Sequence, residues 1–380
     1  MPFKPNRHKV ADVQEALKAL ANLPLDVRPP TWLIPINNIP PNELLACANG
    51  LLHVPTRTLL PATPLFYTHN AIEVHYDPDL PPPIEWKKFL VDIFGADAEA
   101  VSTLQEIFGY IMIPDTHQQK IFLIVGPKRS GKGTIARIIT ALLGQDNVCA
   151  PTLSSLSQNF GLAPLIGKQA AIIADARIGG SVDQHIIAER LLSISGEDSI
   201  TIDRKYLPAW TGRLNIRFLI LSNFLPKITD ASGALPSRFV LLTLTKSFYG
   251  MEDLGLFDRL QKELPSILNW AIEGLIRLQH RGAFVQPASA FDAVQELEDL
   301  SSPVKTFISD RCELNPTYEI ECQTLFTAWK EWCQTQGRDH VGTIQTLGRD
   351  LRAAAPDVKS AQHREGEERI RVYTGIRLAG

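Results

Sequence analysis

Four mostly apolar runs in the middle of the chain have the length of buried β-strands. The first, 121–125, reads IFLIV, and comparable runs follow at 170–174, 216–221 and 240–244. Apolar runs without the alternation of a half-exposed strand are typical of a parallel sheet covered on both faces. Polar segments follow the first three runs, and ligands bind at the carboxyl edge of such a sheet. The pattern therefore predicts an α/β fold with a ligand site at that edge.

Helical periodicity flanks this core on both sides. Apolar residues recur at helical spacing over 86–108, which predicts two amphipathic helices, and over 253–280, which predicts a helical segment interrupted near Pro265. Residues 1–85 are rich in proline and predict an irregular module. We expect four parts: an N-terminal helical or irregular module over 1–110, the α/β core over 111–250, a helical lid over 251–300 and a C-terminal domain over 301–380.

Composition limits the classes of function. Of the 380 residues, 44% are hydrophobic and 21% charged, and the net charge is -3, so a nucleic-acid partner has to be held by local basic sites. The N-terminus lacks a signal peptide, and no run reaches the ~18 apolar residues of a membrane span. Five cysteines without a C-x-x-C pair predict reduced thiols. We expect a cytoplasmic protein with no membrane partner.

A glycine-containing loop directly follows the first apolar run. Its glycines allow backbone N–H groups to turn toward phosphate oxygens, and the helix that follows presents its N-terminus to the same charge. Lys132 is the residue that neutralises the β- and γ-phosphates, so the loop predicts ATP binding. The residue after Lys132 is Gly133, so the hydroxyl for Mg²⁺ comes from Thr134 or is missing. The predicted phosphate-binding residues are Gly126, Pro127, Lys128, Arg129, Ser130, Gly131, Lys132, Gly133 and Thr134.

Two further polar residues end neighbouring predicted strands. Asp175 follows the second run, where a carboxylate can hold hydrated Mg²⁺ beside the phosphates. The next residue is Ala176, so the second acid that often activates water is missing; Glu197 or Asp198 are candidates, and the sequence does not assign this base. Asn223 ends the third run, where an amide can orient the attacking water or sense the γ-phosphate.

A short hairpin is predicted between the second and third runs. Ile200 and Ile202 alternate with polar residues, and a polar turn follows them. Arg204 and Lys205 lie near the tip of this hairpin, where cations can hold the phosphates of DNA. A solvated loop is the alternative interpretation of the same residues.

The ordered set of motifs resembles the helicase part of phage and plasmid primases, related to the poxvirus primase-helicase. These proteins are superfamily 3 members of the AAA+ class. The motifs are the loop 126–134 and the segments 175–177, 196–198, 221–223 and 231–239. The upstream segments 49–52, 76–78 and 104–110 resemble the helical module before that helicase, and Trp329, 332–333 and 373–375 are similar to its winged-helix-like ending.

This resemblance implies a P-loop AAA+ core with a parallel sheet. A mostly helical N-terminal module precedes the core, and a helical lid and a winged-helix-like C-terminal domain follow it. By the same resemblance, Lys132 and Thr134 bind the triphosphate, Asp175 serves the metal, and Asn223 acts as a polar sensor.

The resemblance also implies partners. Arg238 is the arginine finger that reaches a neighbour's ATP, and Lys205 belongs to the DNA-gripping hairpin. The implied activity is an ATP-dependent DNA helicase that assembles as a homo-oligomer, a hexameric ring. It acts on single-stranded DNA and forked duplex DNA, with a possible primase or polymerase partner. Its implied setting is the cytoplasm of a bacterial host cell, for a protein encoded by a phage or plasmid.

Two other functions remain open. In the first, the tail recognises a replication origin and the ATPase only assembles a platform. Four arginines of the tail favour DNA binding: Arg364, Arg369, Arg371 and Arg377. Three neighbouring acids reduce the local positive charge: Glu365, Glu367 and Glu368. In the second, the protein is a small-molecule phosphotransferase, because the sequence GKGT at 131–134 also resembles the loop of nucleoside monophosphate kinases.

Overall fold

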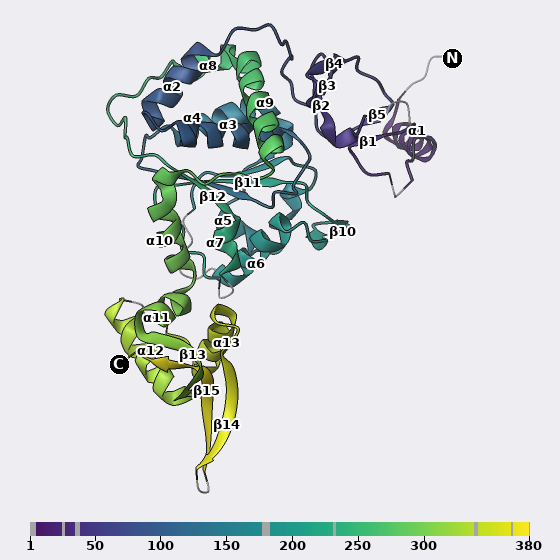
Figure 1. Ribbon diagram of the computed structural model, residues 1–380. Coiled ribbons are helices and arrows are strands. Elements are labelled where there is room, and N and C mark those ends of the chain that lie inside the picture. The colour runs from purple at the N-terminus through teal and green to yellow at the C-terminus, as the bar shows by residue number, and fades with distance from the viewer. Residues whose placement is uncertain are drawn as a thin grey trace.

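The computed structural model describes residues 5–24, 27–34, 39–176, 183–230, 233–337, 341–365 and 368–379. Its centre is a five-stranded parallel sheet with the strand order β12-β6-β11-β8-β7 (Figure 1). The strands are β6 (Ile121–Val125), β7 (Val148–Cys149), β8 (Ala170–Ile173), β11 (Arg217–Ser222) and β12 (Phe239–Thr243). The four predicted strands and the parallel sheet are confirmed. The sequence missed β7, because two residues give no periodic signal.

Both faces of the sheet are covered by helices because the strand side chains alternate between two apolar clusters. In β6, Phe122 and Ile124 belong to one cluster, and Ile121 and Leu123 to the other. The first face is covered by α2 (Ile84–Phe94), α3 (Ala98–Met112), α4 (Lys132–Leu143), α8 (Leu256–Lys262) and α9 (Leu264–Arg281) (Figure 1). The second is covered by α5 (Leu153–Leu156), α6 (Gln184–Ser195), α7 (Ala234–Arg238) and α10 (Phe291–Ser301).

Helices α3 and α9 are in close contact, although their segments are far apart in the sequence. A Cβ atom at Gly109 would lie 2.5 Å from a backbone oxygen of α9, and one at Gly274 would lie 2.5 Å from a backbone oxygen of α3. The buried carboxylate of Glu106 accepts hydrogen bonds from Arg277 and Arg281 of α9. Helix α9, in the segment 251–300 that the sequence predicts as a lid, is therefore anchored to α3, which precedes the core.

The predicted interruption near Pro265 is confirmed. Helix α8 ends at Lys262 and α9 begins at Leu264, with the proline in its first turn. The residue between them, Glu263, accepts hydrogen bonds from the backbone N–H groups of Glu85 (3.1 Å) and Trp86 (2.9 Å). This break therefore supplies the N-terminal cap of α2.

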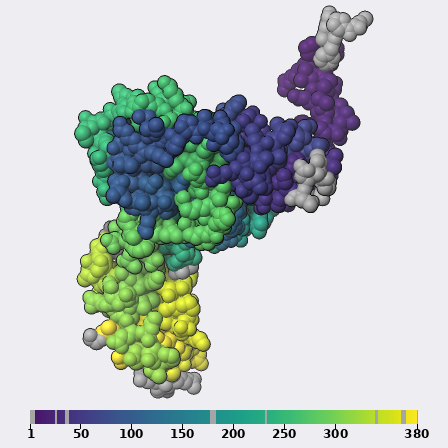
Figure 2. Space-filling model, turned by 45° about the horizontal axis from the view of Figure 1, so that its top comes forward, coloured from purple at the N-terminus to yellow at the C-terminus, as the bar shows by residue number. Residues whose placement is uncertain are grey.

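The two helices predicted in the N-terminal region are confirmed as α2 and α3, whereas α1 (Arg7–Leu20) was not predicted, and the described residues of this region also form two small antiparallel sheets. One pairs β1 (Thr31–Trp32) with β5 (Phe66–Tyr67); the other joins β2 (Leu44–Cys47), β3 (Gly50–His53) and β4 (Thr58–Leu60). The sequence did not predict these strands, because they are short and lie between prolines. Helix α1 has no buried residue, and Figure 2 shows this purple segment projecting from the body.

The predicted hairpin is confirmed as β9 (Ile200–Arg204) paired with β10 (Leu207–Gly212). Lys205 and Tyr206 form its turn, and Tyr206 has a positive φ of 62°. Among the described residues, short 3-10 helices lie at η1 (Pro41–Glu43), η2 (Gln145–Asn147), η3 (Ala163–Leu165) and η4 (Ala288–Ala290).

The C-terminal part has its own apolar cluster around Phe307, Trp329 and Trp332 and forms a separate lobe (Figure 2). It begins after α10, close to the boundary expected at 301–303. Its elements are α11 (Pro303–Arg311), β13 (Cys312–Glu321), α12 (Cys322–Thr335), α13 (Ile344–Ala354), β14 (Lys359–Glu365) and β15 (Glu368–Leu378). The strands form an antiparallel sheet in the order β13-β15-β14.

The cysteines are free thiols, as predicted. Burial raises the pKa of Cys47 to about 12 and that of Cys149 to about 11. These thiols are therefore protonated at neutral pH and poor nucleophiles. The described residues contain no helix with the length and apolar character of a membrane span.

Candidate nucleotide-binding site

The loop between β6 and α4 is held against two neighbouring elements. Gly131 has a φ of 98°, and a Cβ atom there would lie 2.9 Å from the side chain of Ile93 in α2. A Cβ atom at Gly126 would lie 2.6 Å from the carbonyl oxygen of Leu244, just after β12. These contacts explain why glycine is needed at both positions. The strand, loop and helix together have the arrangement of a P-loop.

Lys132 folds back into this loop. Its Nζ donates to the carbonyl oxygens of Gly126 (2.5 Å) and Pro127 (2.8 Å) and to Ser130 Oγ (3.2 Å). It also donates to Asn223 Oδ1 at 3.2 Å, so the structure brings together these two predicted site residues. Burial lowers the pKa of Lys132, and all four of these partners are neutral oxygens. A phosphate anion placed here would supply the missing counter-charge, so the loop fits a nucleotide.

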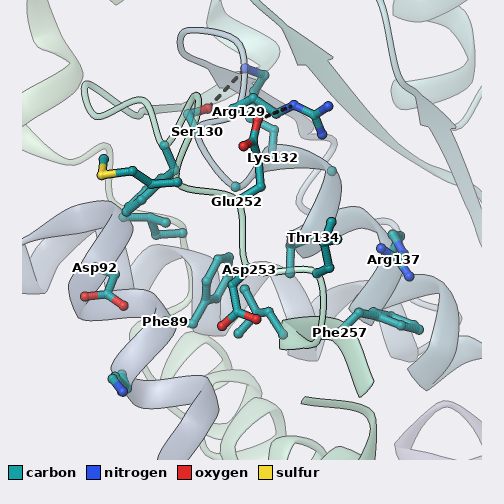
Figure 3. Close-up of a pocket in the computed structure, with 18 of the residues that line it drawn as sticks. Phe89, Asp92, Arg129, Ser130, Lys132, Thr134, Arg137, Glu252, Asp253 and Phe257 are labelled. Atoms are coloured by element: carbon teal, nitrogen blue, oxygen red, sulfur yellow. Dashed lines mark hydrogen bonds and ion pairs between the residues drawn. The ribbon is translucent and has the colours of Figure 1, made fainter. Parts of the chain in front are cut away.

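A cavity of about 790 Å³ opens in front of the loop (Figure 3). Thr134 and Arg137 of α4 line one side, and Phe89 and Asp92 of α2 another. Phe257 of α8 lies 3.7 Å from the Arg137 guanidinium, measured from the ring centroid. The walls from α2 and α8 were not predicted from the sequence, because their apolar residues have the same spacing as residues that only pack a core.

Ion pairs connect the rim of the cavity. Arg129 of the loop pairs with Glu252 at 3.3 Å (Figure 3). Arg259 of α8 pairs with Glu85 of α2 at 2.9 Å and with Asp253 at 2.5 Å. These side chains are partly exposed, so each pair contributes little stability by itself. Together they link α2, the loop and α8 around the mouth of the cavity.

Asp175 lies at the same sheet edge but outside the lining of this cavity. It follows β8, whereas Asn223 follows β11, the neighbouring parallel strand. Thr134 lines the cavity. Its hydroxyl and the Asp175 carboxylate therefore both lie at the sheet edge that carries the P-loop. Mg²⁺ usually takes only one or two protein ligands beside phosphate oxygens, and a hydroxyl and a carboxylate are groups of the kind that it binds. Arg177 and residues 231–232 of the matching motifs lie outside the described residues.

Arg238 lies at the opposite edge of the sheet. It is the last residue of α7, before β12, and its guanidinium donates to the Gln119 side chain, before β6. The five residues of β6 separate this edge from the P-loop by about 17 Å. Lys120 lies beside it, and burial and the charge of Arg238 lower the pKa of Lys120. Arg238 therefore cannot reach the nucleotide cavity of its own chain.

Glu197 also lies near this opposite edge. Its Oε1 accepts a hydrogen bond of 2.6 Å from Thr116, which precedes β6, and Gln119 Nε2 donates to the carbonyl oxygen of Gly196 at 3.4 Å. Strand β6 separates this edge of the sheet from the edge that carries the P-loop. Glu197, one of the two candidates for the catalytic base, therefore cannot serve the nucleotide site of its own chain.

The hairpin tip combines a cation and an aromatic ring. Lys205 Nζ lies 5.2 Å from the ring centroid of Tyr206, and Tyr206 is 92% exposed. Arg204 folds back along the hairpin, where its Nε donates to the carbonyl oxygen of Pro208 at 2.9 Å. The sequence predicted a role for the two cations but none for Tyr206, because the exposure of Tyr206 depends on the turn that follows β9.

Two family models match separate segments of the chain. Residues 9–95 match the family described as D5 N terminal like, and residues 124–238 match a family of unknown function, DUF5906. The D5-like match confirms the predicted resemblance to the poxvirus-type primase-helicase. The D5-like segment runs from α1 to the end of α2 and includes the wall of the nucleotide cavity. The DUF5906 segment runs from the last residues of β6 to Arg238.

Among solved structures, the apo C-terminal region of NrS-1 is 13% identical with a TM-score of 0.49, covering 96% of this chain and 90% of that chain. A JCV helicase with a bound thiazolopyridine acetamide is 16% identical with a TM-score of 0.30, covering 57% of this chain and 66% of that chain. Because both TM-scores are below 0.5, no conclusion rests on these likenesses.

Proposed function

We propose that the protein is an ATP-dependent DNA helicase, a ring-forming AAA+ motor of superfamily 3. The observation that carries this proposal is the division of site residues between two sheet edges. Lys132 and Asn223 meet at one edge, and Arg238 lies at the other. A site divided in this way is completed by a second copy of the chain. The strand order, 5-1-4-3-2 when the five strands are numbered along the core, supports the AAA+ assignment.

In the proposed site, the P-loop binds the ATP phosphates and the apolar walls bind the base. Lys132 exchanges its neutral partners for phosphate oxygens, which releases the Asn223 amide to orient the attacking water. Thr134 and Asp175 hold Mg²⁺, which neutralises charge on the phosphates when bound. Phe89 and the Phe257–Arg137 pair line the cavity, where they offer aromatic surface to a planar base.

Arg238 completes the site of the neighbouring subunit. Its guanidinium stabilises charge on the transferring γ-phosphate, and Lys120 adds a second cation at the same edge. Because each chain offers one P-loop edge and one Arg238 edge, the contacts are head-to-tail and close into a ring, which we propose to be hexameric.

The hairpin contacts single-stranded DNA in this proposal. Lys205 holds a backbone phosphate, and the exposed ring of Tyr206 offers a base a stacking surface. The C-terminal order helix, strand, helix, helix, strand, strand supports a winged-helix-like domain that acts at forked duplex DNA or contacts a primase or polymerase. Origin binding through β14 and β15 is the second candidate, favoured by Arg371 and Arg377 on β15.

Lys205→Ala tests the motor function. We expect roughly threefold weaker binding to single-stranded DNA and a salt slope smaller by about 0.7, because one phosphate contact is lost. ATP affinity stays unchanged, whereas strand separation per ATP hydrolysed falls. Fluorescence anisotropy with a labelled oligonucleotide and a forked-duplex unwinding assay measure the two effects.

The matched control is Lys18→Ala, which removes the same charge from the exposed helix α1. Unchanged DNA affinity, salt slope and unwinding in the Lys205 variant would show that the hairpin tip makes no contact with DNA. ATP consumption that requires an added nucleotide acceptor, with no stimulation by DNA, would instead favour the phosphotransferase. Tight duplex binding that depends on Arg371 and Arg377, without unwinding, would favour the origin platform.

A further inference from the structure

A second cavity, of about 610 Å³, lies between the N-terminal region and the base of the hairpin. We propose that it binds a single strand of nucleic acid through its phosphodiester backbone. We call it the hairpin-base groove. It is lined by 28–30, 44–46, 68–70, 166–169, 210–215, Met112 and Pro114. The proposal rests on the proposed function and adds a second DNA contact, away from the hairpin tip.

The charge of the hairpin-base groove is the first argument. Arg28, Lys168 and Arg213 line it, and the described residues of its lining include no carboxylate side chain. This cationic lining occurs in a chain whose net charge is -3. Lys168 Nζ donates to a backbone carbonyl oxygen, at 2.5 Å, and Arg28 and Arg213 are exposed. A lining whose described charged side chains are cations attracts a polyanion.

The nucleotide cavity differs in this respect. Its lining mixes its cations with four carboxylates: Glu85, Asp92, Glu252 and Asp253. Three of these acids pair with Arg129 or Arg259. The uniformly positive charge of the lining therefore distinguishes the hairpin-base groove from the nucleotide cavity.

Two uncharged residues of the hairpin-base groove fit nucleobases. Gln169 is only 4% exposed; its Nε2 donates to the carbonyl oxygen of Met112 at 3.2 Å, whereas its Oε1 has no hydrogen-bond partner. A buried acceptor without a donor is costly, and an N–H group of a base, such as the ring N3–H of thymine, supplies such a donor. Trp210 is half-buried in the wall formed by β10 and offers a ring for stacking.

Size and position favour a single strand. A cavity of about 610 Å³ encloses a ligand of a few hundred daltons, which corresponds to one or two nucleotides. A duplex of even a few base pairs contains several times as many nucleotides and does not fit this volume. Strand β10, on the side of the core that carries the N-terminal strands in Figure 1, connects the hairpin-base groove to Lys205. Its six residues span about 20 Å, so one strand can contact both places.

The double variant Arg28→Ala with Arg213→Ala tests the proposal in the full-length protein. We expect oligothymidylate to bind roughly tenfold more weakly at about 0.1 M salt, with a salt slope smaller by about 1.4, because two phosphate contacts are lost. ATP hydrolysis without DNA stays unchanged, because neither residue lines the nucleotide cavity. Anisotropy titrations across a salt series measure affinity and slope together.

The matched control is Arg7→Ala with Lys18→Ala, which removes the same charge from exposed α1. We expect this control to bind like the unmodified protein. Unchanged affinity and slope in the Arg28 and Arg213 variant, beside weakened binding by Lys205→Ala, would overturn the groove and leave the proposed function standing. An equal loss of affinity for a duplex of the same length would overturn the single-strand assignment. Failure of the unmodified protein to bind any single-stranded DNA would contradict the proposed helicase function itself.

Discussion

Lys132 illustrates how a residue identified from sequence acquires its environment from the fold. Its position after Gly131 locates the phosphate site, but its contact with Asn223 joins residues that are 91 positions apart. The ammonium group is surrounded by neutral oxygens, and burial lowers its pKa. It therefore gains electrostatic stabilisation only when an anion arrives, which is the property expected of a phosphate-binding lysine.

We expect Lys132→Ala to lower ATP turnover by at least about 100-fold, because the variant loses the cation that stabilises charge on the phosphates. Its melting temperature should change by no more than a few degrees, since the side chain contributes no apolar packing and its oxygen partners can bind water. A coupled phosphate-release assay and thermal denaturation check the two statements. Near-normal ATP turnover by a folded variant would contradict the assignment of the P-loop to the catalytic site.

At the scale of secondary-structure elements, the pairing of α3 with α9 determines how the regions before and after the sheet are joined. Glycines at 109 and 274 allow the two backbones to approach closely. The buried Glu106 carboxylate is paired with Arg277 and Arg281. Removing the arginines would leave a buried charge without a partner, which destabilises a fold strongly. The helices that precede and follow the sheet in the sequence are thereby joined on one face of it.

Gly274→Ala should destabilise the protein by about 1–3 kcal/mol, because its methyl group would lie 2.5 Å from the backbone of α3. The matched control is Gly133→Ala, at a helical position where an added Cβ atom meets nothing within 4 Å. The control should be neutral or gain up to about 1 kcal/mol from helix propensity. Urea denaturation compares the two variants. Equal stability of both would mean that α3 and α9 separate at little cost.

At the scale of the whole molecule, the separation of Arg238 from the P-loop predicts complementation between subunits. Arg238→Ala and Lys132→Ala proteins should each be inactive alone and recover part of the ATP turnover when mixed, because some interfaces then join an intact P-loop to an intact Arg238. Steady-state hydrolysis against mixing ratio measures this.

The mixing experiment needs two controls: both variants must still assemble, and the Arg238 variant must still bind ATP. Full turnover by Arg238→Ala alone, or turnover by isolated monomers, would contradict the ring.

The sequence by itself determined the parallel sheet, the P-loop and the hairpin, because each depends on local patterns: buried apolar runs, glycine spacing and alternation over a few residues. It could not determine the walls of the nucleotide cavity, since Phe89 and Phe257 have the spacing of ordinary core residues. Nor could it place Glu197 at the edge of the sheet opposite the P-loop, or gather Arg28, Lys168 and Arg213 around one groove. Those arrangements depend on which distant segments pack together, and that was decided only by the tertiary structure.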